Sequence, residues 1–291
     1  MNNANFVLTT DATCDLSKNY TDERNIMVMP MSYTIDKKTY KGTEDDSLSQ
    51  KDFYSKLRDG CLSQTSQINP DAFVNFFEDL LKTGVNVLHI AFSSALSGTC
   101  NNAFIAAQEV NSKFSEVKVV VVDSLCASMG EGLLVYYAAK LRDDGKTVDE
   151  VKDWIEANKL KLCHYFTVDN LFHLHRGGRV SKTAAIVGSV LGVKPILHVD
   201  DEGRLTPVSK IRGRKQALCE LVDRMQSVVG HNKNEIIFIS HGDCYEDAVF
   251  VADLIKERFG INNFMIDYIG PVIGTHSGPG TVALFFLGDK R

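Results

Sequence analysis

The chain has 291 residues, of which 44% are hydrophobic and 24% are charged, and its formal net charge is −5. This composition is ordinary for a globular protein, and the length favours two domains of usual size. The net negative charge argues against a protein that binds a nucleic-acid backbone. No apolar run is long enough to cross a bilayer, and residues 1–11 lack the basic and apolar segments of an export signal. We therefore expect a cytoplasmic protein without a transmembrane segment.

Alternating apolar and amphipathic segments predict the fold class of the first half. Asn69 and Pro70 have the pattern of a helix N-cap and first turn, and Gly84 has that of a helix end. Because strands alternate with helices, we expect a parallel sheet with helices on both faces. The expected strands are 5–10, 86–93 and 117–124, and the expected helices are 69–84, 98–113 and 127–141.

The pattern changes in the second half, after a charged and partly helical stretch that we interpret as a hinge. Six strand-like runs follow, with helices near Ser181, Gln216 and Glu246 between only some of them, so this sheet is expected to be mixed. We predict a two-domain α/β protein, with the parallel sheet in an N-terminal domain over 1–160 and the mixed sheet in a C-terminal domain over 161–291. The expected C-terminal strands are 163–169, 194–201, 204–212, 234–242, 262–270 and 281–288.

The sequence carries no recognisable pattern for a cofactor. There is no G-x-x-x-x-G-K-[ST] loop for a nucleotide, no H-E-x-x-H metal spacing and no G-x-S-x-G elbow around a nucleophile. The seven cysteines are scattered and form no C-x-x-C pair. We expect reduced, mostly packed thiols, no metal site and no cofactor.

Hydroxyl side chains collect where predicted strands end and helices begin. Thr65 lies ahead of the helix at 69–84, and the loop before the helix at 98–113 holds more hydroxyls than N-capping requires. Helix N-termini expose unpaired N–H groups, so such loops suit a carboxylate or a phosphate. The hydroxyl residues of the second loop are Ser93, Ser94, Ser97 and Thr99.

One histidine, His276, stands among four glycines and two prolines in the segment GPVIGTHSGPG, residues 270–280. Because glycine and proline favour irregular backbone, we predict a tightly shaped loop here and not a helix. The loop precedes the last predicted strand, at a sheet end where ligands often bind. A packed turn with a surface imidazole is the alternative reading of this histidine.

A basic stretch runs from Arg176 to Lys215, where nine basic residues face three acidic ones. This local charge indicates an anionic group or an acidic partner near the stretch. A solvated charged face explains the same count equally well.

Seven motifs in order resemble the DegV family over essentially the whole chain. They are TDATCDL, TSQ, SSALSGT, VVDS followed by GEG, RGGRVS, KPIL followed by GRL, and GPVIGTHSGPG. The resemblance implies a two-domain α/β protein that holds one fatty acid between its domains. It also implies a FakB-like role as the fatty-acid-binding subunit of bacterial fatty acid kinase, which is a lipid carrier and not an enzyme.

The resemblance also implies which residues meet the ligand. An arginine of RGGRVS would lie near the head group or the partner, and both Arg176 and Arg179 fit that position. The acyl tail would lie in a buried tunnel. The side chains assigned to the fatty acid carboxylate are Thr65, Ser93, Ser94 and His276.

The implied partners are a long-chain fatty acid and an ATP-dependent fatty acid kinase, which would convert the carboxylate to an acyl phosphate for phospholipid metabolism. Transient membrane contact fits this role, and nucleic acid does not. Three alternatives stay open from the sequence. They are a stand-alone hydrolase or transferase that uses Ser94 and His276, lipid storage or delivery without a kinase, and a regulator that binds nucleic acid through its basic stretch.

Overall fold

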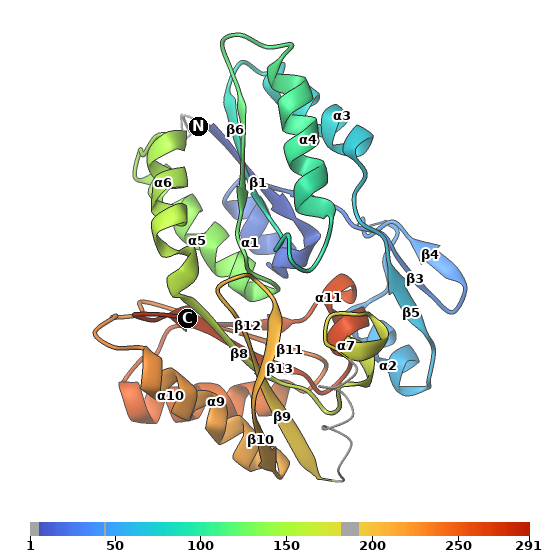
Figure 1. Ribbon diagram of the computed structural model, residues 1–291, viewed down its shortest axis with the longest axis vertical. Coiled ribbons are helices and arrows are strands. Elements are labelled where there is room, and N and C mark those ends of the chain that lie inside the picture. The colour runs from blue at the N-terminus through green and yellow to red at the C-terminus, as the bar shows by residue number, and fades with distance from the viewer. Residues whose placement is uncertain (1–5, 44, 182–191) are drawn as a thin grey trace.

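The computed structural model describes residues 6–43, 45–181 and 192–291 and contains three β-sheets (Figure 1). The helix expected near Ser181 lies outside the described residues. Within the described part, the two larger sheets account for all nine strands that the sequence analysis predicted. The mixed α/β class is therefore confirmed.

The first sheet is parallel throughout, in the order β2-β1-β6-β7. Helices α3 and α4 pack on one face, and α5 and α6 pack on the other. The Asn69 side chain accepts a hydrogen bond from the Ala72 amide at 2.8 Å, so the predicted N-cap of α3 is confirmed. The elements are β1 (Phe6–Asp11), β2 (Ile26–Met29), β6 (Asn86–Ala91), β7 (Val119–Asp123), α3 (Pro70–Leu81), α4 (Thr99–Asn111), α5 (Met129–Asp143) and α6 (Val148–Asn158).

The second sheet is mixed, in the order β10-β9-β8-β13-β11-β12, and only β11 and β12 run parallel. All of its strands lie after residue 161, and α9 and α10 pack on one face. The elements are β8 (Leu162–Thr167), β9 (Val193–Val199), β10 (Leu205–Arg212), β11 (Ile237–His241), β12 (Phe264–Tyr268), β13 (Val282–Leu287), α9 (Arg214–Val228) and α10 (Tyr245–Phe259).

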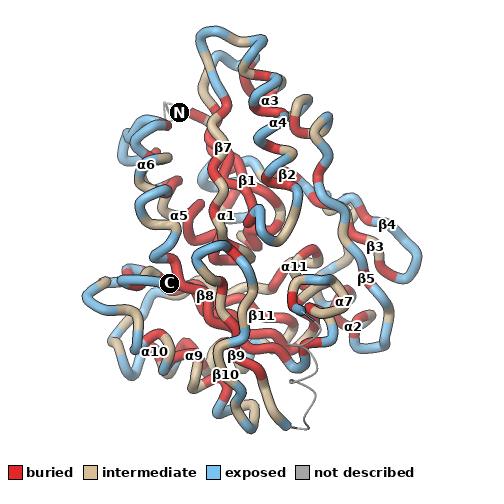
Figure 2. The backbone as a smooth tube through the Cα atoms, viewed as in Figure 1, coloured by how far each residue is buried: buried red, intermediate tan, exposed pale blue. Residues whose placement is uncertain are grey.

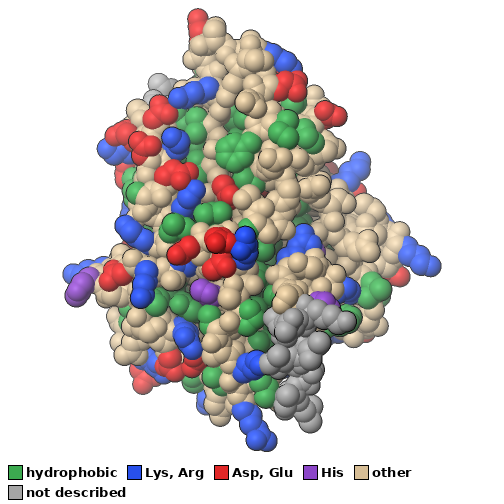
Figure 3. All heavy atoms as spheres, viewed as in Figure 1, with side chains coloured by type: hydrophobic (Ala, Val, Ile, Leu, Met, Phe, Trp, Pro, Cys, Tyr) green, Lys and Arg blue, Asp and Glu red, His purple; other side chains and the backbone are tan. Residues whose placement is uncertain are grey.

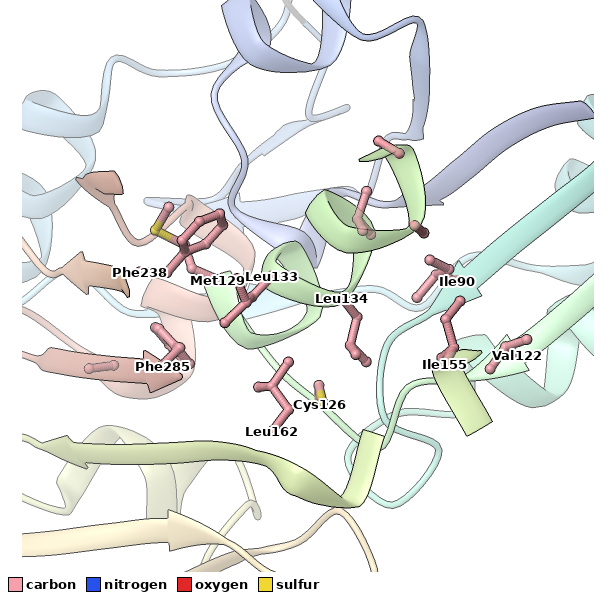
Figure 4. Close-up of a cluster of buried hydrophobic side chains, with 14 of the residues drawn as sticks. Ile90, Val122, Cys126, Met129, Leu133, Leu134, Ile155, Leu162, Phe238 and Phe285 are labelled. Atoms are coloured by element: carbon pink, nitrogen blue, oxygen red, sulfur yellow. The ribbon is translucent and has the colours of Figure 1, made fainter. Parts of the chain in front are cut away.

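Helix α5 covers the other face of the second sheet as well as the first sheet. Leu134 belongs to the same buried cluster as Ile90 of β6 and Phe285 of β13 (Figure 4). Figure 2 shows buried residues concentrated on α5 and on the strands beside it. One hydrophobic core thus runs across the proposed boundary at residue 160.

A third, smaller unit was not predicted. Its three strands have the order β4-β3-β5 and are three residues long, too short to give a clear period-two pattern. Tyr33, Phe53 and Tyr54 pack there against Ile269, from the C-terminal half. The remaining elements are η1 (Ala12–Cys14), α1 (Lys18–Glu23), β3 (Tyr33–Ile35), β4 (Lys38–Tyr40), α2 (Gln50–Arg58), β5 (Ser63–Thr65), η2 (Lys159–Lys161), α7 (Phe172–Arg176) and α11 (Pro271–Ser277).

The segment predicted as a loop around His276 is helix α11, so that prediction is wrong. Pro271 occupies the first turn, where its missing N–H costs no hydrogen bond, and Gly278 ends the helix with φ +79°. The position inside the helix at residue 274 requires glycine, because a Cβ there would stand 2.6 Å from the Tyr54 hydroxyl oxygen. Gly274 therefore permits close packing, whereas Gly278 permits the backbone turn that ends the helix.

The guanidinium of Arg291 joins segments of both sheets. Its contacts are the carbonyl oxygens of Leu125, Lys159, Leu162 and Asp200, at 2.7 to 3.0 Å, and the Cys126 Sγ at 3.2 Å. Replacing this side chain removes all of these contacts, although the amides of Gly203 and Leu162 still donate to the carbonyl oxygens of Asp200 and Lys159.

We expect Arg291→Ala to lower the free energy of unfolding by about 2–3 kcal/mol, because acceptors that keep a second donor reduce the loss below the full ~1.5 kcal/mol for each charge-assisted hydrogen bond. Urea denaturation followed by circular dichroism measures the change. Arg258→Ala, which removes a surface pair with Asp223, is the matched control and should cost less than about 1 kcal/mol. Equal costs for the two variants would contradict the assignment.

Candidate functional site

A cavity lies between the carboxyl ends of β1, β6 and β7 and the facing strands of the second sheet. Loop residues Thr13, Phe92 and Ser128 line it from the first sheet, and Phe166 and Phe285 line it from the second. The empty volume between the lining atoms is about 740 Å³, which includes the part open to solvent. Most of the lining is apolar, so the cavity suits a hydrophobic ligand.

A polar group stands where the cavity approaches the surface. Thr65, Arg179 and His276 line the cavity and also line a hollow on the surface. The Thr65 Oγ1 and the His276 Nε2 lie 2.8 Å apart in a hydrogen bond. The structure thus brings together two residues that lie 211 positions apart in the sequence.

Two local contacts fix His276 in this position. The Ser63 Oγ and the Thr275 Oγ1 are 2.6 Å apart, so β5 is bonded to α11 next to the Thr65 contact. Gly177 presses against the other side of the ring, where a Cβ would stand 2.2 Å from the His276 Nδ1. A side chain at residue 177 would therefore displace the imidazole.

Burial lowers the pKa of His276 to about 4, with Arg179, Arg176 and His173 as further causes. The imidazole is therefore neutral at pH 7 and offers one N–H donor, not a positive charge. Of the two roles open from the sequence, a donor or a counter-charge, the structure favours the donor.

The two arginines of RGGRVS supply positive charge beside this imidazole. Arg176 Nη2 donates to the carbonyl oxygens of Ser63 and Thr275 at 3.4 and 3.5 Å, and Arg179 Nε donates to that of Leu96 at 3.2 Å. No ion pair among the described residues includes either arginine. Burial lowers the pKa of both guanidinium groups, so an anion here would compensate partly desolvated charge.

The hydroxyl-rich loop after β6 presents a different serine from those assigned. Ser93 is buried and donates to the Gly203 carbonyl oxygen at 2.9 Å. Ser94 is exposed, and its amide donates to the Asp123 Oδ1 at 3.2 Å. Neither residue is among those that line the cavity, whereas Ser97 does line it. The sequence shows that the loop is rich in hydroxyls but not which of them turns inward.

The described residues show little that points to other kinds of ligand. They include no group of three or more His, Cys, Asp or Glu that could hold a metal ion. Every described helix is too short or too polar to cross a bilayer. Figure 3 shows acidic and basic side chains interspersed over one face, without a continuous basic surface.

Comparison with known proteins assigns the family. The sequence model of the DegV family matches residues 5–289, and a DegV domain-containing protein of Clostridium perfringens is 46% identical over 98% of both chains. The chain belongs to the DegV family.

Solved DegV structures share the fold. DegV of Bacillus subtilis, a fatty acid binding protein, matches with a TM-score of 0.84 and 30% identity over 98% of this chain and 100% of that one. A DegV family protein of Thermus thermophilus with fatty acid binding matches with a TM-score of 0.87 and 27% identity, over 98% and 99%. The expected family and fold are thus confirmed.

A buried carboxylate that sequence reasoning missed holds the start of helix α11. Asp15 accepts hydrogen bonds from the Gly270 amide at 2.9 Å and from the Ser128 hydroxyl at 2.5 Å. Asp15 therefore links the first sheet to the helix that carries His276. In the sequence, Asp15 is the second aspartate of the motif TDATCD. Its backbone lies in the left-handed region, with φ +52°.

Burial raises the pKa of Asp15 from 3.8 to about 7. Between pH 3.8 and about pH 7, Asp15 binds a proton more readily in the folded protein than in the unfolded chain. The stability that this protonation contributes is therefore lost as the pH rises through that range. Relative to Asp15→Asn, the wild-type free energy of unfolding should fall by on the order of 2 kcal/mol between pH 4 and pH 7.5.

Urea denaturation across this pH range tests the prediction. Asp59→Asn, on an exposed residue, is the control and should follow the wild-type curve. Parallel pH profiles for wild type and Asp15→Asn would show that Asp15 does not titrate as its burial implies.

Proposed function

We propose that this chain binds a long-chain fatty acid, with the tail in the cavity and the carboxylate near Thr65, Ser97 and His276. The observation that carries the proposal is an apolar cavity that ends at a neutral imidazole and at Arg179, with Arg176 in the adjoining surface hollow, and neither arginine has a described carboxylate partner. The fatty acid binding of the DegV proteins from Bacillus subtilis and Thermus thermophilus supports it.

Tail burial would supply most of the affinity. A ~16-carbon tail gains roughly 0.8 kcal/mol per CH₂, on the order of 12 kcal/mol before the costs of association. The polar end would then orient the ligand, because a carboxylate that leaves water needs replacement donors.

The surface hollow suggests how the carboxylate would be used. Arg176, Arg179 and His276 line it, so a bound carboxylate would be within reach from outside. In our proposal, a partner kinase supplies ATP, a carboxylate oxygen attacks the terminal phosphorus, and ADP leaves as the acyl phosphate forms. The arginines would stabilise the added negative charge. A cytoplasmic location and a ligand site between domains 1–160 and 161–291 are part of this proposal.

A stand-alone hydrolase or transferase has less support. The hydrogen-bond partner of the His276 Nε2 is Thr65, and the exposed Ser94 is not among the cavity-lining residues. A nucleophile and its base must lie within hydrogen-bond reach of one another. Lipid storage or delivery without a kinase uses the same cavity and differs only in whether a kinase acts on the bound acid.

We expect His276→Ala and Thr65→Val each to weaken fatty acid binding about tenfold to hundredfold, because each removes a hydrogen-bonding group from a charged head group. Titration of delipidated protein with hexadecanoic acid by calorimetry gives the dissociation constants. His231→Ala, at an exposed histidine, is the control and should bind like wild type. Unchanged affinity in both site variants would show that the carboxylate does not bind at this end of the cavity.

Protein purified from a bacterial host should release about one fatty acid per chain on denaturation and solvent extraction, as identified by mass spectrometry. Addition of a bacterial fatty acid kinase and labelled ATP to the loaded protein should then yield acyl phosphate. Lipid release without acyl phosphate would favour storage or delivery, and an extract without lipid, together with no uptake of added fatty acid, would contradict the binding proposal.

A further inference from the structure

The cavity wall contains a buried hydroxyl that the proposed head-group site does not use. Ser277 is 6% exposed, it lines the cavity, and its Oγ has no hydrogen-bond partner among the described residues. A buried hydroxyl without a partner is unfavourable, and such groups in proteins are usually satisfied by a ligand or by water. This atom therefore indicates where a polar group of the ligand would bind.

The other hydroxyls of the cavity wall are already engaged. Each makes a hydrogen bond to a protein atom, so none of them has the same need of a ligand. The pairs are Thr13 with Glu131, Thr65 with His276, Ser97 with Thr99, Ser128 with Asp15, and Thr281 with the carbonyl oxygens of Ser277 and Gly278.

The place of Ser277 along the cavity sets which ligand atom it meets. It follows His276 directly in α11, but unlike His276 it does not line the surface hollow. Because Ser277 is adjacent to His276 but lines only the cavity, a carboxylate at His276 would leave the first carbons of the acyl chain as the part of the ligand near Ser277.

We propose that Ser277 forms a subsite for a hydroxyl group on the acyl chain close to the carboxylate, so that the cavity prefers a 3-hydroxy fatty acid to the unsubstituted acid. This inference rests on the proposed fatty acid binding. An unsubstituted tail leaves the Ser277 hydroxyl unpaired, whereas a chain hydroxyl can form one hydrogen bond with it, as the donor or as the acceptor. The cavity therefore binds the 3-hydroxy acid more tightly, because only that ligand gives the buried Ser277 hydroxyl a hydrogen-bond partner.

The test compares two ligands of equal chain length, hexadecanoic acid and 3-hydroxyhexadecanoic acid, on delipidated full-length protein by calorimetry. Wild type should bind the hydroxy acid about threefold to tenfold more tightly, the effect of one buried hydrogen bond. Ser277→Ala should lose this preference and bind hexadecanoic acid at least as well as wild type does. Ser112→Ala, at an exposed serine directly after helix α4, should keep the preference.

Equal affinity of wild type for the two acids would overturn the subsite and leave the fatty acid proposal standing. Equal weakening of both acids by Ser277→Ala would also overturn it, because the hydroxyl would then serve the carboxylate or the fold. Binding of neither acid would overturn the proposed function and the subsite together. Ser277→Thr, which keeps a hydroxyl, should retain the preference if the alanine variant loses it through chemistry and not through misfolding.

Discussion

The burial of α5 between the two large sheets is the constraint on which the rest of the structure depends. Residues 129–135 of α5 are all buried, so this part of the helix must be covered on all sides, with β6 on one flank and β13 on another. Met129, at its first position, is fully buried, and the residue before it, Ser128, lines the cavity. The packing that joins the sheets thus also sets the distance between the loops of one and the strands of the other.

The electrostatics of the site follow from the same burial. His276 loses its charge because the surrounding protein excludes water, whereas the arginines keep theirs because a guanidinium holds its proton far more strongly. A neutral donor beside fixed positive charges favours an anion without placing a second titrating charge next to it. Such a site would hold a carboxylate over the pH range in which the imidazole stays neutral.

The sequence predicted the large features of the fold because they depend on local patterns. Asn69 and the apolar runs of both sheets each carry a signal within a few residues. The three-residue strands and α11 carry no such signal, since Gly274 is explained only by its contact with Tyr54, which lies far away in the chain. A sequence pattern cannot show a close approach between distant segments.

The candidate site shows the same limit. The family resemblance assigned Thr65, His276 and an arginine of RGGRVS to one ligand, and the structure places Thr65, Arg179 and His276 around one hollow. Which serine of the hydroxyl-rich loop turns inward depends on the backbone of that loop. Its amides at Leu96 and Ser97 both bond to the Ser93 carbonyl, and this turn leaves Ser97 on the cavity wall. Asp15 is missed for a related reason, since its partner Gly270 lies 255 positions away.

The contact between Ser93 and Gly203 limits how the chain can vary. Gly203 has φ +79°, and a Cβ there would stand 2.3 Å from the Ser93 Oγ, so the turn between β9 and β10 accepts neither another side chain nor an inserted residue without moving. Leu205, two residues later, lines the cavity. The length of this hairpin is therefore fixed by a loop of the other sheet, and changes in ligand preference would have to arise by substitution of wall residues, not by insertion in this turn.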